Sequence, residues 1–460
     1  MSLRMRRVFF YLCAAAFLVL GTMLVFSARG WSLDFARVRV VSTGALFVKS
    51  VPNDAELFIN GKETPRGISL LSSGTFIDKM RPDTYEVTVA KQGYTSWSKV
   101  LSVSSSKVTA ATRAILWPTT LVETTIAKQV ASFWLTGAGI VVANSSGTLS
   151  LGNRPIRGEA VVGHDQASSK VITKEGSIFF LTDLASPDAS LNLSALFRSL
   201  HERLPSPTLP KRTRSETVEP RLQSVLLHPF SDTKLILGAN DGLYELDTRK
   251  VGLERLAFVE RFTTMAKGGS DVFIVNGSST VTAVNLVLKT SVAYPFPIAG
   301  TLRELIASDN GQGVAGIEAN GTLTLLDRGT ETLTRITDDA TAVQFFPGVP
   351  ALLFLTSENH LGAYYYRDVA DDELHRKGEF RVSASPLPLA ASGTIGWALS
   401  FPGTLLVHAN GTLLASETDL RSNLNTTVLA TGLAAYAIED TMLYVLDEDG
   451  TLRSATLANK

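Results

Sequence analysis

The hydrophobic residues of this chain follow two patterns, and each predicts a different kind of element. Residues 8–26 read VFFYLCAAAFLVLGTMLVF, a stretch without a charged side chain. A helix of that length nearly matches the hydrocarbon core of a bilayer, which is about 30 Å thick. From residue 43 onward, short alternating runs of apolar and polar residues are bounded by Gly, Pro, Asn, Asp and Ser, as is typical of strands and turns. We therefore expect one N-terminal membrane helix followed by an all-β chain.

The stretch from Val8 to Phe26 is predicted to anchor the protein in a membrane as a single span. A cleaved signal peptide is the alternative, but cleavage after Ala28 would place the bulky Phe26 where a small residue is needed. A buried core helix would need regularly spaced polar positions, and this stretch has no charged one. Arginines flank both ends, at positions 4, 6 and 7 and at positions 29, 37 and 39, so charge alone leaves the orientation open.

Residues 43–118 contain five strand-sized runs: ALFVKSV, AELFING, TYEVTVAKQGY, WSKVLSVSSS and KVTAATRAIL. Their alternation and their turn residues predict antiparallel strands. Asn60 and Gly61 fit a tight type I′ hairpin turn, because both central residues of that turn need a positive φ. Tyr94 and Trp97 lie near a glycine at a strand end, where an aromatic side chain more often closes a small core than binds a ligand.

A set of residues in this segment is shared with a known family: Gly44 before VKSVP, Ala55, Phe58–Gly61, Thr64-Pro65, the run from Tyr85, Lys91, Gly93, Tyr94 and Trp97. With this set, the segment resembles the PEGA domain, a small β-sandwich common in bacterial surface and signalling proteins. Two turn glycines of the family are absent, because Pro52-Asn53-Asp54-Ala55 stands for Pro-x-Gly-Ala and Pro82-Asp83-Thr84-Tyr85 for Pro-Gly-x-Tyr. The resemblance implies a β-sandwich displayed outside the cytoplasm, and hence a cytoplasmic N-terminus.

Between Leu121 and Leu457 a unit of strand, polar turn and strand recurs eight times. The turns centre near Gly147, Gly176, Gly242, Gly277, Gly321, Asn359, Gly411 and Gly450. One unit spans about 42 residues, the length of a β-propeller blade. Packing blades around an axis buries the apolar faces and protects the strand edges of such hairpins. We predict a degenerate propeller with seven or eight blades, favouring eight; a β-sandwich or a β-helix is the rival architecture.

One interval between turns is longer than the others, and we interpret residues 184–221 as an inserted loop. Apolar residues at helical spacing predict a short amphipathic helix over Leu193–Leu204, with Asn192 or Ser194 as its N-cap. The run that follows reads first as an exposed, solvated loop. The alternative is a partner-binding loop that uses its basic residues, Lys211, Arg212, Arg214 and Arg221.

Composition removes several functional classes. Lys plus Arg and Asp plus Glu number 43 each, so the chain lacks the basic excess of a nucleic-acid binder. Cys13 is the only cysteine, and the six histidines (His164, His201, His228, His360, His375 and His408) fall in separate repeats or loops without ligand spacing, so the sequence predicts neither a metal site nor a cofactor. Nucleophile and nucleotide motifs are missing. Asp447–Gly450 reads as a hairpin turn because the oxygen ligands of a calcium loop do not follow it.

These observations predict three parts: a cytoplasmic tip and membrane helix in residues 1–30, a juxtamembrane segment and PEGA-like sandwich in 31–118, and a β-propeller in 119–460. We expect a single-pass cell-membrane protein with its bulk outside, acting as a non-enzymatic scaffold that binds an envelope protein or glycan. The alternative is a propeller hydrolase or lyase that acts on a glycan through two acidic residues at the channel mouth.

Overall fold

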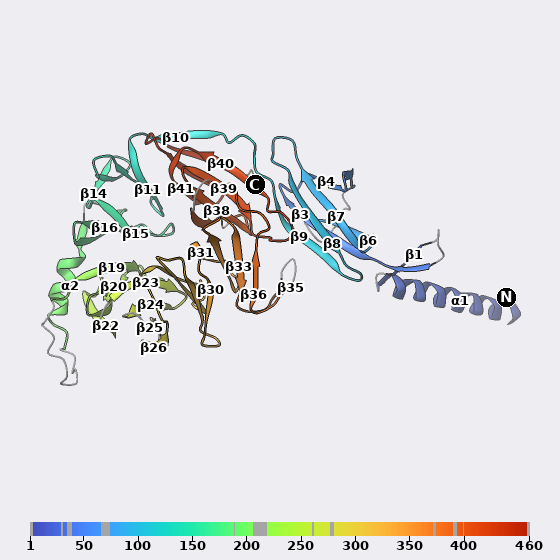
Figure 1. Ribbon diagram of the computed structural model, residues 1–460, viewed down its shortest axis with the longest axis horizontal. Helices are drawn as coiled ribbons and strands as arrows, with labels where there is room; N and C mark the ends of the chain where they lie inside the picture. Colours follow the sequence, from blue (N-terminus) through green and yellow to red (C-terminus); the bar gives the residue numbers. More distant parts are fainter. Residues whose placement is uncertain are drawn as a thin grey trace.

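The computed structural model describes residues 3–28, 31–34, 39–65, 74–187, 189–205, 219–259, 262–276, 280–370, 374–389, 393–398 and 400–457. Helix α1 (Leu3–Ala28) contains the predicted apolar stretch. Within the described part of the chain, its window Met5–Thr22 is the one helical segment long and apolar enough to cross a membrane, and none of that window is buried. Figure 1 shows α1 projecting from one end of an otherwise β-rich molecule. The predicted N-terminal apolar helix and the all-β architecture are thus confirmed.

A small β domain follows α1 and the hairpin of β1 (Trp31–Asp34) and β2 (Arg39–Ser42). Its strands are β3 (Gly44–Val51), β4 (Glu56–Ile59), β5 (Lys62–Glu63), β6 (Thr75–Met80), β7 (Asp83–Ala90), β8 (Trp97–Val103) and β9 (Val108–Ile115). They form two sheets, ordered β6-β3-β9 and β5-β4-β7-β8. Alternate residues of β8 are buried and pack with residues of both sheets, so the domain core lies between the sheets. Asn60 and Gly61 have φ of 49° and 74°, as the predicted turn requires.

The prediction that all strands of this domain are antiparallel was wrong. Strand β9 pairs with β3 in parallel, with Ala45 opposite Val108. The chain leaves β8 at the edge of one sheet and crosses to the other sheet before it forms β9. A strand that follows a tight turn pairs antiparallel with the strand before it, whereas a strand that follows a crossover between sheets can run parallel to its new neighbour, as β9 does beside β3. Strand β6 was not predicted at all, because its sequence TFIDKM lacks a clear alternation of buried and exposed positions.

The rest of the described chain forms eight four-stranded antiparallel sheets. Four sheets consist of β10 (Glu123–Ala127), β43 (Leu452–Thr456), β42 (Met442–Asp447) and β41 (Leu433–Glu439); β11 (Val130–Thr136), β12 (Gly139–Asn144), β13 (Leu149–Leu151) and β14 (Arg154–Ile156); β15 (Ala160–Gly163), β16 (Lys170–Glu175), β17 (Ile178–Asp183) and β18 (Ser190–Asn192); and β19 (Leu222–Leu227), β20 (Lys234–Ala239), β21 (Gly242–Asp247) and β22 (Gly252–Phe258).

The other four consist of β23 (Phe262–Gly268), β24 (Asp271–Asn276), β25 (Thr280–Asn285) and β26 (Thr290–Pro295); β27 (Leu302–Ala307), β28 (Gly313–Glu318), β29 (Leu323–Asp327) and β30 (Thr332–Thr337); β31 (Ala340–Phe345), β32 (Ala351–Thr356), β33 (Leu361–Tyr365) and β36 (Glu379–Val382); and β37 (Thr394–Trp397), β38 (Thr404–Ala409), β39 (Thr412–Glu417) and β40 (Thr426–Thr431). The sheet of β31, β32, β33 and β36 also carries the hairpin of β34 (Val369–Ala370) and β35 (Leu374–His375).

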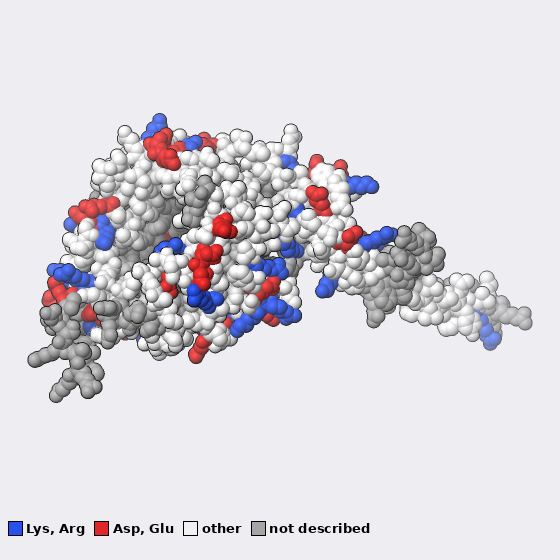
Figure 2. All heavy atoms as spheres, in the orientation of Figure 1, with Lys and Arg blue, Asp and Glu red and all other residues white. Residues whose placement is uncertain are grey.

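The sheets close into a ring, which makes this region a β-propeller (Figure 1). Each neighbouring pair of sheets shares a buried apolar cluster, and the last sheet shares one with the first. At the seam, β10 supplies the outer strand of a sheet whose other strands, β41 to β43, come from the chain end. Leu446 and Leu452 of this sheet pack against Phe133 and Leu135 of β11. The space-filling view is hollowed near the centre of the ring (Figure 2).

The eight hairpins predicted from the sequence are the middle two strands of the eight sheets. Outside the sheet of β11 to β14, these are the most buried strands of each sheet; every residue of β28 and of β32, for example, is buried. Gly277, the centre of one predicted turn, lies outside the described residues.

The interpretation of residues 184–221 as a loop was only partly right. Residues Ser190–Asn192 form β18, which completes the sheet of β15 to β17. Helix α2 (Leu193–His201) follows at once and is shorter than predicted, and Asn192 caps it because its Oδ1 accepts from the Ala195 amide at 2.9 Å.

Candidate functional site

A turn-capping residue recurs in the propeller at the end of the third strand of several sheets: Asp183, Asp247, Asn285 and Asp327. In each, the side-chain Oδ1 accepts backbone N–H groups of the turn that follows; Asp247, for example, accepts from the Arg249 and Lys250 amides at 3.0 and 2.9 Å. Asp and Asn suit this position because their short side chains reach the amide two residues ahead. The repeat therefore carries its own local turn signal.

Glu417 occupies the equivalent position at the end of β39, and its carboxylate points instead to the small β domain. Its Oε1 accepts from Lys99 Nζ at 2.5 Å and its Oε2 from Trp97 Nε1 at 2.9 Å. The Asn425 amide and side chain add two further donors to Oε1, each at 2.9 Å. The Lys99 side chain has no exposed surface, so Glu417 is the counter-charge of an ammonium removed from water.

The segment 418–425 also binds one edge strand of each sheet of the small domain, β8 and β9. Asn425 accepts from the Ser98 amide and donates to the Ser98 carbonyl, each at 3.0 Å, so its side-chain amide takes the place of a neighbouring strand beside β8. Ser422 Oγ accepts from the Val100 amide at 3.3 Å. On the other sheet, Arg421 donates to the Ala110 carbonyl of β9 at 2.9 Å. The propeller thus covers strand edges that could otherwise pair with another chain.

A second carboxylate, that of Asp419, supports the same contact. It lies 3.5 Å from Lys99 Nζ, and it accepts from Arg421 Nη2 at 2.7 Å. Burial alone would raise the pKa of the Asp419 carboxyl, but hydrogen bonds from Arg421 and the positive charges of Lys99 and Arg421 outweigh burial and hold this pKa below its usual value. Asp419 is therefore ionised in the docked protein at neutral pH.

Apolar packing joins the two domains beside this polar contact. Trp117, which follows β9, is 5% exposed and belongs to a cluster with Phe401, Leu433 and Leu457 of the propeller. The rings of Trp117 and Phe401 are centred 4.9 Å apart. Because this cluster links β37–β40 to the sheet that closes the ring, the small domain packs at the seam of the propeller. We call the whole contact, from Trp97 and Lys99 to Glu417–Asn425 and Trp117, the junction.

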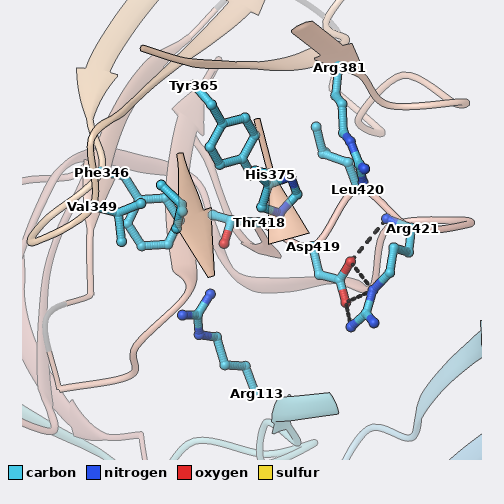
Figure 3. Close-up of a pocket in the computed structure, with 11 residues that line it drawn as sticks. Arg113, Phe346, Val349, Tyr365, His375, Arg381, Thr418, Asp419, Leu420 and Arg421 are labelled. Carbon is cyan, nitrogen blue, oxygen red and sulfur yellow. Dashed lines mark hydrogen bonds and ion pairs between the residues drawn. The ribbon is translucent and has the colours of Figure 1, made fainter. Parts of the chain in front are cut away.

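Three cavities lie along the junction, and Arg113 of β9 lines all three of them. Figure 3 shows the largest, into which Arg113 reaches between Phe346 and Val349 on one side and Asp419 on the other. Tyr365 and His375 form its far wall, where their rings stack 3.9 Å apart. The three cavities have volumes of about 30, 20 and 10 Å³. Cavities of this size hold single water molecules and are too small for a glycan.

Of the four sequence-predicted site residues, only Arg221 lies in the part of the chain that the structure describes, and it is not at the junction. Lys211, Arg212 and Arg214 are outside the described residues. The Arg221 side chain is 77% exposed and lies 3.8 Å from Glu219, at the side of the ring opposite to the junction loops. Among the described residues no group of three or more His, Cys, Asp and Glu side chains could hold a metal ion.

The six histidines stay apart in the structure. His201 Nε2 lies 2.9 Å from Asp241 Oδ2 and ties α2 to the propeller. His360 and His408 contact backbone carbonyls through one ring nitrogen each, and His375 stacks on Tyr365. Asp447–Gly450 forms the turn between β42 and β43, with the Gly450 amide donating to the Asp447 carbonyl at 3.0 Å.

The junction itself was not predicted. Trp97 is 3% exposed in the core of the small domain, as expected, but its indole N–H also binds Glu417. One signal was available: Lys99 alternates with apolar residues on the buried side of WSKVLSV, and a lysine on a core-facing position needs a partner. The identity of that partner, more than 300 positions away in the sequence, could not be read from the pattern.

No family model and no curated protein matches the chain. Several solved structures have a similar course of the chain. BamB from Moraxella catarrhalis is 14% identical with a TM-score of 0.42, and the match covers 74% of this chain and 99% of that one. The β-propeller domain of Myceliophteria thermophila Cps50 (Swd1) is 9% identical with a TM-score of 0.40, over the same shares of the two chains. A chain of the mitotic checkpoint complex is 10% identical with a TM-score of 0.41, over 74% and 92%.

Proposed function

We propose that the protein is a membrane-anchored, extracytoplasmic scaffold of eight blades that presents one face of its propeller to an envelope protein. Residues 1–30 form the cytoplasmic tip and anchor, residues 31–118 the juxtamembrane segment and PEGA-like domain, and residues 119–460 the propeller. The observation that carries this proposal is the junction, because a buried Lys99–Glu417 pair and a shared apolar cluster fix the propeller on the small domain that follows α1. A carrier with a fixed orientation suits presentation better than catalysis in a cleft.

The partner face follows from strand geometry. In a four-stranded antiparallel sheet, the turn between the second and third strands lies at the opposite end from the other two turns. The small domain contacts loops of the latter kind, at Phe346–Val349 and Thr418–Asn425. The turns around Gly321, Asn359 and Gly411 are therefore on the other face, and the peptide that joins α2 to β19 starts and ends there. We propose that Lys211, Arg212 and Arg214, with Arg221, add positive charge to this face for an acidic partner.

The experiment uses photo-crosslinking in native membranes of the full-length protein. A crosslinker at exposed Asn320, on the proposed partner face, should give a defined adduct with an envelope protein, and a crosslinker at Arg249, on the junction side, should give none. Replacing Lys211, Arg212 and Arg214 with serine should weaken the adduct. Equal labelling from both sites, or protection of the C-terminal part from protease added outside the membrane, would refute the proposal.

A further inference from the structure

The loop that connects β19 to β20 carries an exposed phenylalanine at its tip. Phe230 is 59% exposed, and it lies on the junction side of the ring but three sheets away from the nearest sheet that contacts the small domain. Val287 and Leu288, in the turn after β25, are 66% and 71% exposed. Lys289 of that turn reaches back to Glu245 of β21 at 2.6 Å, and so does His228 of the Phe230 loop at 3.4 Å. The three apolar side chains thus belong to two loops that share one carboxylate.

His228 holds the Phe230 loop in place through one defined ring nitrogen. Its Nδ1 accepts from the Phe230 amide at 3.1 Å, and its side chain is 7% exposed. A nitrogen that accepts an N–H carries no proton, so the neutral ring is protonated at Nε2, which faces the Glu245 carboxylate. The residue between them is Pro229, which has no amide of its own, so this hydrogen bond is a main local constraint on Phe230.

The charged groups around His228 come from three elements. Glu245 of β21 lies at its Nε2, while Lys234 of β20 and Lys289 of the next sheet bind the two oxygens of that carboxylate at 2.8 and 2.6 Å. Burial lowers the pKa of His228 most, and the two lysines lower it further, while Glu245 raises it; the net result is a pKa below the usual 6.5. The neutral, loop-holding form is therefore the form present at neutral pH.

We propose that His228 is an acid-sensitive clasp for the Phe230 loop. Protonation converts Nδ1 from an acceptor into a donor that faces the Phe230 N–H, so the hydrogen bond is lost and two N–H groups oppose each other. The pKa of His228 is lower in the folded protein than in the unfolded chain. The hydrogen bond from the Phe230 amide is therefore fully formed above the pKa of the unfolded chain, and it is lost as the pH falls through the pKa of the folded protein. The Phe230 amide and its exposed side chain then lose this restraint, while Lys170 and Thr248 still hold the carbonyls of Asp232 and Thr233 in the rest of the loop.

Hydrogen exchange of the full-length protein in detergent, measured at about pH 7 and about pH 4.5 and corrected for the intrinsic exchange rate, tests the clasp. Protection of the Phe230 amide should fall about tenfold on acidification, as expected for the loss of one hydrogen bond. The Gly311 amide is the internal control and should keep its protection, because it donates to the Ser308 carbonyl at 2.8 Å in the turn between β27 and β28, the first two strands of another sheet, and this turn contains no histidine.

The variant His228→Asn supplies an amide oxygen that can accept from the Phe230 amide at every pH, and its protection should not change with acidification. Unchanged protection of Phe230 in the wild-type protein would overturn the proposal. An equal loss in His228→Asn, or an equal loss at the Gly311 amide, would overturn it too. If His228→Asn does not fold, the comparison between the Phe230 amide and the control amide within the wild-type protein still decides whether the proposal holds.

Discussion

The turns after β17 and after β39 occupy the same place in their sheets but have different tasks. Asp183 ends β17 and binds groups of its own turn region: its Oδ1 accepts from the Ala185 amide at 3.1 Å and from Ser169 Oγ at 3.0 Å. Glu417 ends β39 and binds Trp97 and Lys99 of another domain. One added methylene lets the carboxylate reach beyond its own loop. A repeat position that stabilises a turn locally can thus become the centre of a domain contact.

Removing the Glu417 carboxylate should have the largest effect on stability and is the strongest test of the difference between the two turns. Glu417→Ala leaves Lys99 without its closest counter-charge in a site with no solvent access, and we expect a loss of about 3 to 5 kcal/mol in the free energy of unfolding. The small domain should also become more susceptible to protease. Urea unfolding of the detergent-solubilised protein measures the loss, and Glu86→Ala, an exposed glutamate on β7, is the control that should change little.

The double variant Lys99→Met with Glu417→Leu separates charge burial from packing. Replacing both partners of a buried ion pair with apolar side chains is often neutral, so most of the stability lost in Glu417→Ala should return. A double variant as unstable as Glu417→Ala would mean that the contacts of Glu417 with Trp97 and Asn425, and not the charge of Lys99, account for the loss.

Acidification is expected to weaken the junction by a smaller amount. The folded pKa of Asp419 is depressed, so its contribution is complete above the usual value of 3.8 and is lost as the pH falls through the lower folded pKa. Thermal unfolding of the wild-type protein should show a drop below about pH 4 that is reduced in Asp419→Asn. An identical pH profile in Asp419→Asn would contradict this assignment.

The sequence predicted the parts of the fold that depend on local patterns. Residues 8–26 of α1 carry no charge, and the middle strands of the sheets are rich in apolar residues and are joined by turn residues, as in β32 and at Gly321. The outer strands are half exposed and short, as β14 (Arg154–Ile156) is, and give no clear period. Strand β9 was assigned correctly as a strand but with the wrong direction, because the choice of partner in a sandwich depends on the path between sheets.

The junction could not be predicted for a different reason. Its contacts join residues such as Lys99 and Glu417 that are separated by most of the propeller, and a lysine on a strand does not reveal which acid it meets. The turn-capping series did contain a clue, because Glu417 is a longer acid at a position where four other sheets have Asp or Asn, and a longer turn follows it. A comparison of the repeats marks Glu417 as one of the departures from the capping pattern, but it does not show what the carboxylate binds.

Asn425 tests how much the capping of a strand edge contributes. Asn425→Ala removes both hydrogen bonds to Ser98 on β8 and one to Glu417, and we expect a loss of about 1 to 2 kcal/mol, because the backbone groups of this edge strand can partly turn to water. Urea unfolding gives the value. Asn423→Ala, in the same segment, is the matched control. A loss as large as that of Glu417→Ala would make the edge, and not the ion pair, the main determinant of docking.

The smallest effect is expected at Asp183, which has the regular capping role and contacts no other domain. In Asp183→Ala the Ala185 amide loses its acceptor, but this amide lies in an exposed turn where water can replace the carboxylate, so the loss should be about 0.5 to 1 kcal/mol. Asp183→Asn should be nearly neutral, because Asn285 fills the same position in another sheet with its amide oxygen. Glu417→Gln, in contrast, should be destabilising, since Lys99 would lose a charge that an amide cannot supply. If Asp183→Ala and Glu417→Ala cost the same, the stability would come from turn capping alone, and the difference between the two turns would have no energetic basis.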